Sequence, residues 1–141
     1  MNKYIFFRTD RIGDFLMSSI LFKSIKNSDN KSIITVIASK KNFDYIKESE
    51  LVDEVILFPE NFIKKFLFSS KFFLKKYYLV GILDGKKRSI YFSFIVRSKY
   101  KFLFTYKKFY NLALKFLYTK IFLDENCTSK FDEIKTLLNY I

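Results

Sequence analysis

The sequence has no histidine, one cysteine and three glycines among its 141 residues. Without histidine, the chain cannot form Ser-His or Cys-His nucleophile pairs, HExxH zinc sites or imidazole acid–base catalysts. Any proton transfer must therefore use a carboxylate, a lysine or a tyrosine. The single Cys127 cannot form an internal disulfide or a cysteine metal cluster, and we interpret it as a semi-buried structural thiol in a reducing compartment.

The sequence also lacks a long hydrophobic run. The apolar residues before Arg8 extend only from Tyr4 to Phe7, which is too short for a signal peptide. The most apolar stretches, residues 62–83 and 89–96, are interrupted by lysine pairs or are too short to span a bilayer. We expect a cytoplasmic protein, and this pattern is compatible with a peripheral position at the cytoplasmic face of the inner membrane.

Length and composition indicate one folded domain. A chain of 141 residues, half of them hydrophobic and 21% aromatic, is long enough to bury a substantial core. The net charge of +12 predicts an anionic partner, and the excess is local: residues 61–120 hold 15 basic and one acidic residue, whereas residues 1–60 hold nine of each. Lysine is far commoner than arginine, a bias typical of AT-rich genomes, so the four arginines stand out: Arg8, Arg11, Arg88 and Arg97.

Strand-like and helix-like segments alternate along the chain. The expected strands are residues 3–7, 33–38, 54–58, 78–83 and 100–106. The expected helices are residues 14–27, 42–48, 61–76, 88–97, 109–120 and 129–140. This alternation predicts an α/β fold, a Rossmann-like doubly wound parallel sheet of about five strands in the order 3-2-1-4-5.

In that order the first and fourth strands are neighbours, and a crevice opens between the loops that follow them. These loops are residues 8–14 and 84–88, and they contain two of the three glycines, Gly13 and Gly85. Glycine there permits a positive φ or the close approach of a ligand to the backbone. The third, Gly81, falls within a strand, which indicates tight packing or a bulge.

Asp14 follows Gly13 at the start of a predicted helix and has two interpretations. It is either an N-cap that accepts backbone N–H bonds, or a general base toward a substrate hydroxyl at the switch point of the sheet. Asp10 and Asp84 fit the second role less well, because each has a basic neighbour that favours simple pairing.

The first loop is neither a G-x-G-x-x-G fingerprint nor a Walker A motif, so nucleotide binding is weakly supported. Lys86, Lys87 and Arg88 precede a helix and form either an anion site or a solvated basic loop. Arg88 favours the first interpretation, because its planar guanidinium suits bidentate binding of carboxylate or phosphate.

Two further segments combine lysine with aromatic residues. Residues 62–76 fit a membrane-surface helix and, equally, a crossover helix packed on the sheet. Residues 99–110 resemble a stacking platform for single-stranded nucleic acid, but a strand with buried aromatics and exposed lysines explains them more simply.

The residues from Ile5 to Leu16, IFFRTDRIGDFL, resemble the opening of glycosyltransferase family 9, the lipopolysaccharide heptosyltransferases and their relatives. The resemblance continues through LVDEVI at 51–56 and LDGKKRS at 83–89. It implies the N-terminal half of a GT-B enzyme, in which a first Rossmann-like domain binds the acceptor and a second binds the nucleotide-sugar.

The resemblance also implies metal-independent inverting transfer, with Asp14 as the base that deprotonates an acceptor hydroxyl. Contacts to an anionic, often phosphorylated acceptor fall to Arg8, Arg11, Gly13, Lys87 and Arg88. No bound cofactor or metal is implied, and the donor is an ADP-sugar.

This chain departs from the family in length, because it holds one domain and the donor half is missing. The acidic residue that often ends the fourth strand in relatives falls at Ile82, with Asp84 two positions later. We expect an acceptor-binding domain that is inactive alone, completed by a separate donor-domain chain, with no nucleic acid as partner. The alternatives are a non-enzymatic basic module that binds a membrane surface or nucleic acid, and a non-functional gene fragment.

Overall fold

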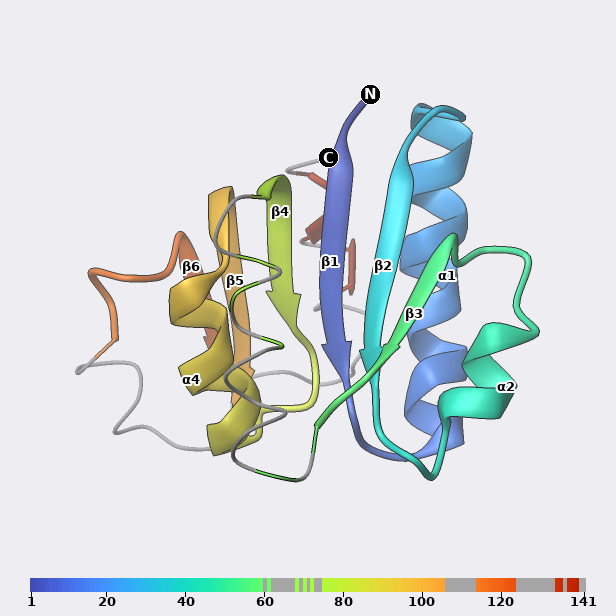
Figure 1. The fold of residues 1–141 in the computed structure, drawn as a ribbon. Coiled ribbons are helices and arrows are strands. Elements are labelled where there is room, and N and C mark those ends of the chain that lie inside the picture. The colour runs from blue at the N-terminus through green and yellow to red at the C-terminus, as the bar shows by residue number, and fades with distance from the viewer. Residues whose placement is uncertain are drawn as a thin grey trace.

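The computed structural model places a parallel sheet at the centre of the molecule, with helices on both faces (Figure 1). It describes residues 1–59, 61, 68, 70, 72, 75–105, 114–123, 134, 135 and 137–139. The elements in chain order are β1 (Lys3–Arg8), α1 (Ile12–Ser28), β2 (Ile33–Ala38), α2 (Phe43–Lys47), β3 (Glu54–Leu57), β4 (Lys76–Ile82), α4 (Lys87–Ile95), β5 (Arg97–Thr105) and β6 (Lys120–Leu123).

The sheet has six strands in the order β3-β2-β1-β4-β5-β6, and every neighbouring pair is parallel. The predicted doubly wound fold and the order of its first five strands are confirmed. The sixth strand was missed: a helix was predicted over residues 109–120, but residues 114–117 form a turn and Lys120 already pairs with Phe102. A four-residue strand carries too little periodicity to be recognised, and the open edge of β5 decides its conformation.

Both faces of the sheet are apolar because both are covered. Tyr4 and Phe6 of β1 point into one buried cluster with α1 and α2, whereas Ile5 and Phe7 point into a second cluster with α4. This alternation accounts for the unbroken apolar runs in β1, β2 and β4. Each face is therefore held by burial of its own set of side chains.

Two segments of which the structure describes only some residues add to the two clusters. Ile134 and Leu137 are buried against the α1 face, as their predicted helical spacing suggested. Phe68 and Phe72 are buried against the α4 face. Most of residues 62–76, predicted as a membrane-surface helix or a crossover helix, lie outside the described residues. Cys127, interpreted as a semi-buried thiol, also lies outside them.

Of the two interpretations of residues 99–110, the structure favours a strand with buried aromatics over a stacking platform for nucleic acid. Phe102 and Phe104 of β5 are buried in the core, so they present no face for stacking. Lys99 is exposed and lies over the rings of Tyr78 and Tyr100, 5.5 and 5.0 Å from their centroids. Residues 106–113 lie outside the described residues.

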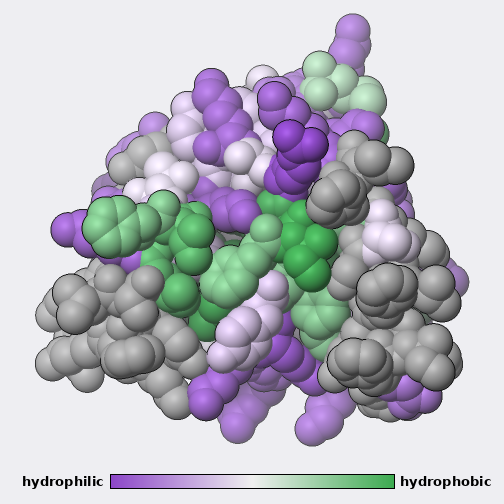
Figure 2. Space-filling model, turned by 60° about the vertical axis from the view of Figure 1, so that its left-hand side comes forward, coloured by the Kyte–Doolittle hydropathy of each residue, from purple (hydrophilic) through white to green (hydrophobic). Residues whose placement is uncertain are grey.

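Helix α4 has an unusual distribution of side chains. Its buried side carries Ser89, Ile90 and Ser93, while Tyr91 and Phe94 are exposed. Figure 2 views the molecule from the side of α4, β5 and β6, where apolar side chains gather at the surface between hydrophilic ones.

The glycines differ in what they tolerate. A Cβ atom on Gly81 would lie 2.6 Å from Cδ1 of the buried Phe6, which confirms tight packing within β4. Gly85 has a φ of 58°, and a Cβ there would lie 2.9 Å from the carbonyl oxygen of Phe104. The turn after β4 therefore requires glycine for both conformation and space.

Gly81→Ala should lower the free energy of unfolding by about 1–3 kcal/mol, because the fully packed ring of Phe6 must shift. Gly13→Ala is the matched control, since nothing lies within 4 Å of its would-be Cβ and it sits inside α1. We expect Gly13→Ala to be neutral or stabilising by up to about 1 kcal/mol. Urea denaturation of both variants measures the difference, and equal stabilities would contradict this account of Gly81.

Candidate functional site

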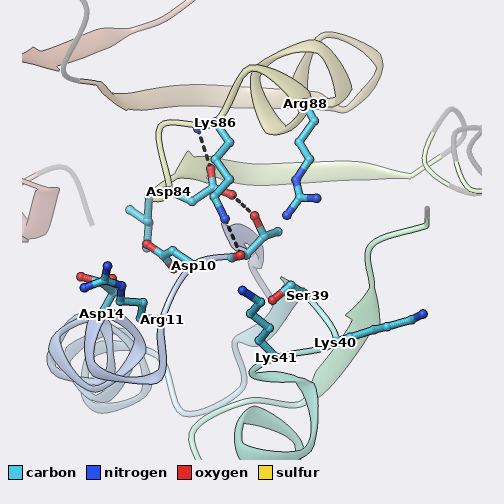
Figure 3. Close-up of a pocket in the computed structure, with 11 residues that line it drawn as sticks. Asp10, Arg11, Asp14, Ser39, Lys40, Lys41, Asp84, Lys86 and Arg88 are labelled. Carbon is cyan, nitrogen blue, oxygen red and sulfur yellow. Dashed lines mark hydrogen bonds between the residues drawn. The ribbon is translucent and has the colours of Figure 1, made fainter.

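A pocket of about 720 Å³ opens at the carboxyl ends of β1, β2 and β4. Its position between the loops after β1 and β4 agrees with the crevice expected at the switch point of the sheet. The loop after β2 forms a third wall (Figure 3). The lining residues are Thr9, Asp10, Arg11, Asp14, Ser39, Lys40, Lys41, Leu83, Asp84, Lys86 and Arg88.

Arg8, the last residue of β1, lies under this pocket and is only 5% exposed. Its guanidinium donates to the Ser18 hydroxyl of α1 (Nε, 2.9 Å; Nη2, 2.6 Å) and to the Asp10 carboxylate (Nη1, 2.7 Å). Nη1 also donates to the Leu83 carbonyl at 2.8 Å. The Arg8 guanidinium thus joins the ends of β1 and β4 to α1. These acceptors stabilise its positive charge in a place that is shielded from water.

Asp10 is the anionic partner of Arg8 and forms part of the pocket wall. Burial raises the pKa of the Asp10 carboxyl, and the adjacent Arg8 guanidinium offsets only part of that effect. One carboxylate oxygen, Oδ2, accepts from Arg8, while the buried Oδ1 has no hydrogen-bond partner. The predicted pairing of Asp10 with a neighbouring base is confirmed.

The third wall is held in place by the buried Asn42. Its side-chain amide donates to the carbonyl of Arg8 at 2.8 Å, and its oxygen accepts from the backbone N–H of Ser39 at 2.9 Å. The loop after β2 is thereby tied to the end of β1. Ser39, Lys40 and Lys41 then line the pocket beside the first loop.

Asp84, after β4, is held by neutral donors. Its Oδ2 accepts from the hydroxyls of Thr9 and Ser89 at 2.5 and 2.7 Å, and its Oδ1 accepts from the backbone N–H of Lys86 at 3.2 Å. The ion pair expected for Asp84 is therefore replaced by these hydrogen bonds among the described side chains. Lys86 instead donates from Nζ to the Thr9 carbonyl at 2.6 Å, and burial lowers the pKa of its ammonium.

Arg88 stands in the first turn of α4 and reaches into the pocket from above (Figure 3). Its guanidinium carbon lies 4.9 Å from the ring centroid of the buried Phe58. Stacking on an aromatic face fixes the plane of a guanidinium and leaves its edge for an anion. Lys41 points toward the same space from the opposite loop, while Lys40 extends away from it.

Asp14 and Arg11 form the other end of the pocket, at the start of α1 (Figure 3). The helix begins at Ile12 with Arg11 in the N-cap position and no side-chain cap, so the interpretation of Asp14 as an N-cap is wrong. Asp14 is a partly buried residue of the first turn. Because Asp14 belongs to a helix, its carboxylate is held more precisely than it would be on a loop, and this precision suits a group that contacts substrate.

The structure brings together three of the residues that the sequence analysis selected. Arg11, Asp14 and Arg88 line the pocket, whereas Arg8, Gly13 and Lys87 do not. Arg8 lies beneath the pocket, and Lys87 is exposed outside it. Ser39, Lys40 and Lys41 also line the pocket and were not predicted, although their place directly after a buried strand was a usable signal.

Among the described residues, no three cysteine or acidic side chains converge as a metal site. In the same part of the chain, no helix combines the length and apolar character needed to cross a membrane.

The fold matches solved structures of glycosyltransferases. A glycosyl transferase family 9 protein from Veillonella parvula aligns with a TM-score of 0.74 at 15% identity, over 99% of this chain and 41% of that chain. Heptosyltransferase WaaC of E. coli, solved with ADP-2-deoxy-2-fluoro heptose, aligns with a TM-score of 0.75 at 12% identity, over 98% of this chain and 47% of that chain. The E. coli ADP-heptose LPS heptosyltransferase II aligns with a TM-score of 0.70 at 15% identity, over 98% and 40%.

These likenesses establish the fold: an α/β arrangement that matches the N-terminal half of a GT-B heptosyltransferase. The chain spans less than half the length of each of these three proteins. No family model matches the sequence, and no curated protein matches it.

The raised pKa of Asp10 predicts how stability depends on pH. The folded protein favours the protonated carboxyl, so the stability contributed by this group is present below the unfolded pKa and is lost as pH rises through the folded pKa. Asp10→Asn removes this dependence. The free energy of unfolding of the unmodified chain, relative to Asp10→Asn, should therefore fall as pH rises above about 4, the ordinary pKa of an aspartate.

Chemical denaturation over that pH range measures the difference. Asp44→Asn, which removes an exposed carboxyl from α2, reports the effect of one surface charge. A difference between the chain and Asp10→Asn that grows with pH would show that the ion pair with Arg8 outweighs the cost of burial.

Proposed function

We propose that the chain is the acceptor-binding half of an inverting glycosyltransferase that transfers a heptose or related sugar to a lipopolysaccharide core or similar glycan. The observation that carries this proposal is the crevice, where an aspartate on the first turn of α1 shares one pocket with cations from three loops. The match of the whole fold to heptosyltransferases of known structure supports it.

The cations select the acceptor. Arg11, Lys40, Lys41, Lys86 and Arg88 line the pocket together with three aspartates, so the cations outnumber the anions. This arrangement favours a saccharide that carries phosphate or carboxylate groups. Arg88 and Lys41 bind its anionic group from opposite sides, and the exposed Lys87 adds to the positive potential at the mouth.

Asp14 acts as the general base. Its carboxylate takes the proton from an acceptor hydroxyl, whose oxygen then forms a bond to the anomeric carbon of the donor sugar. The bond between that carbon and the nucleotide phosphate breaks, and the ADP carries away the electron pair. Attack from the face opposite the leaving group inverts the anomeric configuration.

Arg8 is a positioning residue in this scheme. Its guanidinium holds Asp10 and Leu83 on two walls of the pocket, and it anchors α1 through Ser18 one turn beyond Asp14. Gly13 leaves open space before Asp14, since nothing lies within 4 Å of a would-be Cβ. An acceptor can therefore approach the backbone there.

The donor sugar binds outside the part of the fold that this chain covers. WaaC of E. coli is solved with ADP and with ADP-2-deoxy-2-fluoro heptose, and this chain covers 46–47% of its length. An ADP-sugar is accordingly the donor in the proposed reaction. Its acceptor is a glycolipid at the cytoplasmic face of the inner membrane.

Calorimetric titration with a deacylated, phosphorylated lipopolysaccharide core oligosaccharide tests acceptor binding. Arg88→Gln and Lys41→Gln should each weaken binding roughly tenfold, because each removes a charge-assisted hydrogen bond. Arg97→Gln is the control, because Arg97 is exposed at the amino end of β5 and lies outside the pocket lining. Equal losses in all three variants would indicate nonspecific electrostatic attraction and contradict the assigned site.

Deletion and complementation in the source organism test catalysis. Loss of the gene should shorten a cell-surface glycan by one sugar, as measured by mass spectrometry. Asp14→Asn should fail to restore that sugar, whereas Asp44→Asn, which alters a first-turn aspartate of α2, should restore it. An unchanged glycan in the deletion strain would overturn the proposed function, and rescue by Asp14→Asn would overturn the role of Asp14.

A further inference from the structure

The inner face of α4 packs on the sheet through Ile90 and Phe92, and its outer face carries two exposed aromatic side chains. Ser89 and Ser93 are fully buried, where their hydroxyls bind Asp84 and the carbonyl of Ile90. Tyr91 and Phe94 are 64% and 39% exposed, with ring centroids 6.2 Å apart. A helix that packs only against its own sheet is ordinarily polar on its outer side, so this exposed aromatic pair is suited to contact with a second apolar surface.

The turn before β6 continues this face. Phe94 contacts the ring of Tyr118 at a centroid distance of 6.3 Å, and residues 114–117 lead directly into Tyr118. Within that turn Phe116 is 96% exposed and Leu117 is 54% exposed. Figure 2 shows apolar side chains across this side of the molecule. We call Tyr91, Phe94, Phe116 and Leu117 the aromatic surface.

The charge around the aromatic surface has one sign. Residues 85–123 contain no aspartate or glutamate, while they contain ten lysines and arginines. Lys87 lies on the same side of α4 as Tyr91 and Phe94 by its i, i+4 and i+7 spacing, and Lys115 adjoins Phe116; both lysines are exposed. A surface that combines exposed aromatic side chains with cations and has no nearby carboxylates in the sequence is complementary to an anionic lipid surface.

We propose that the aromatic surface docks onto a bilayer that contains anionic phospholipids. Phe94, Phe116 and Leu117 enter the boundary between head groups and acyl chains, and the Tyr91 hydroxyl stays at the head groups. Lys87 and Lys115 bind the phosphates. Partial insertion of a few side chains gives reversible attachment, which needs no membrane-spanning helix.

This surface adjoins the crevice without being part of it. Helix α4 begins at the pocket, where Arg88 lines it, and the aromatic surface follows along the outer side of the same helix. A bilayer against α4 therefore lies beside the pocket mouth. The inference goes beyond the proposed function and does not depend on it, because lipid binding requires no saccharide.

The absence of tryptophan from the chain permits a direct test. Phe116→Trp introduces a single tryptophan on the aromatic surface. Leu16→Trp introduces one at an exposed position of α1, the helix that packs on the other face of the sheet. Vesicles of phosphatidylcholine with phosphatidylglycerol and brominated acyl chains should shift the emission of the first variant to shorter wavelength and quench it. The second variant should show neither change.

Vesicle sedimentation of the full chain separates the two contributions. Lys87→Gln and Lys115→Gln should each weaken binding about fivefold. Phe94→Ser with Phe116→Ser should weaken it about tenfold or more, while Leu16→Ser with Ile20→Ser should leave it unchanged. Thermal unfolding of each variant establishes that it is folded.

Three results would overturn the proposal. One is equal binding to vesicles of pure phosphatidylcholine, and another is equal quenching of the two tryptophans. The third is a change in oligomeric state in the Phe94→Ser, Phe116→Ser variant with no change in vesicle binding, which would identify the occupant as a second copy of the chain. Failure of acceptor binding or of complementation would leave the vesicle results intact, so the two proposals can fail separately.

Discussion

The buried guanidinium of Arg8 determines the geometry of the crevice. It carries a full charge at the end of β1, and a charge in that environment is tolerated only where acceptors surround it. Those acceptors come from the first loop, from α1 and from the end of β4. The carbonyl of the same residue receives Asn42, which fixes the third loop. The walls of the pocket are thus arranged around one residue that does not line it.

Some polar groups around the pocket form hydrogen bonds within the protein, and others face the pocket. Asp84 accepts hydrogen bonds from two hydroxyls and a backbone N–H, and it forms no ion pair with a lysine or arginine of the described residues. Arg88 is supported from behind by the ring of Phe58, which contributes attraction without neutralising the charge. Both arrangements preserve positive potential in the crevice, where a polyanionic ligand gains most from it.

Much of the fold could be predicted from the sequence because apolar runs and their spacing define parallel strands well. The strand order followed from topology, and the pairing of β1 with β4 located the crevice. The fourth-strand loop followed from Gly85, whose φ of 58° suits glycine. The sixth strand could not be predicted, because four residues hold little periodic signal and the edge of β5 selects their conformation.

The site was less predictable than the fold, because a residue type does not determine whether a side chain lines a cavity or lies beneath it. Arg8 ends β1 and Arg88 begins α4 after the neighbouring β4, yet the first is enclosed and the second faces the pocket. Lys41 was overlooked because its loop has no glycine and no distinctive motif. Its place was set by Asn42, through contacts made 34 residues away along the chain.

The contact between Arg8 and Leu83 also affects when the crevice can form, because the two residues are 75 positions apart in the sequence. Parallel strands bring together distant parts of a chain, and such long-range pairing slows folding. While the protein is synthesised, β1, α1 and β2 emerge well before β4, so the end of β1 holds a cation whose acceptors are incomplete. The complete crevice can form only after the chain has been extended through the start of α4, because Leu83, Asp84, Lys86 and Arg88 line it.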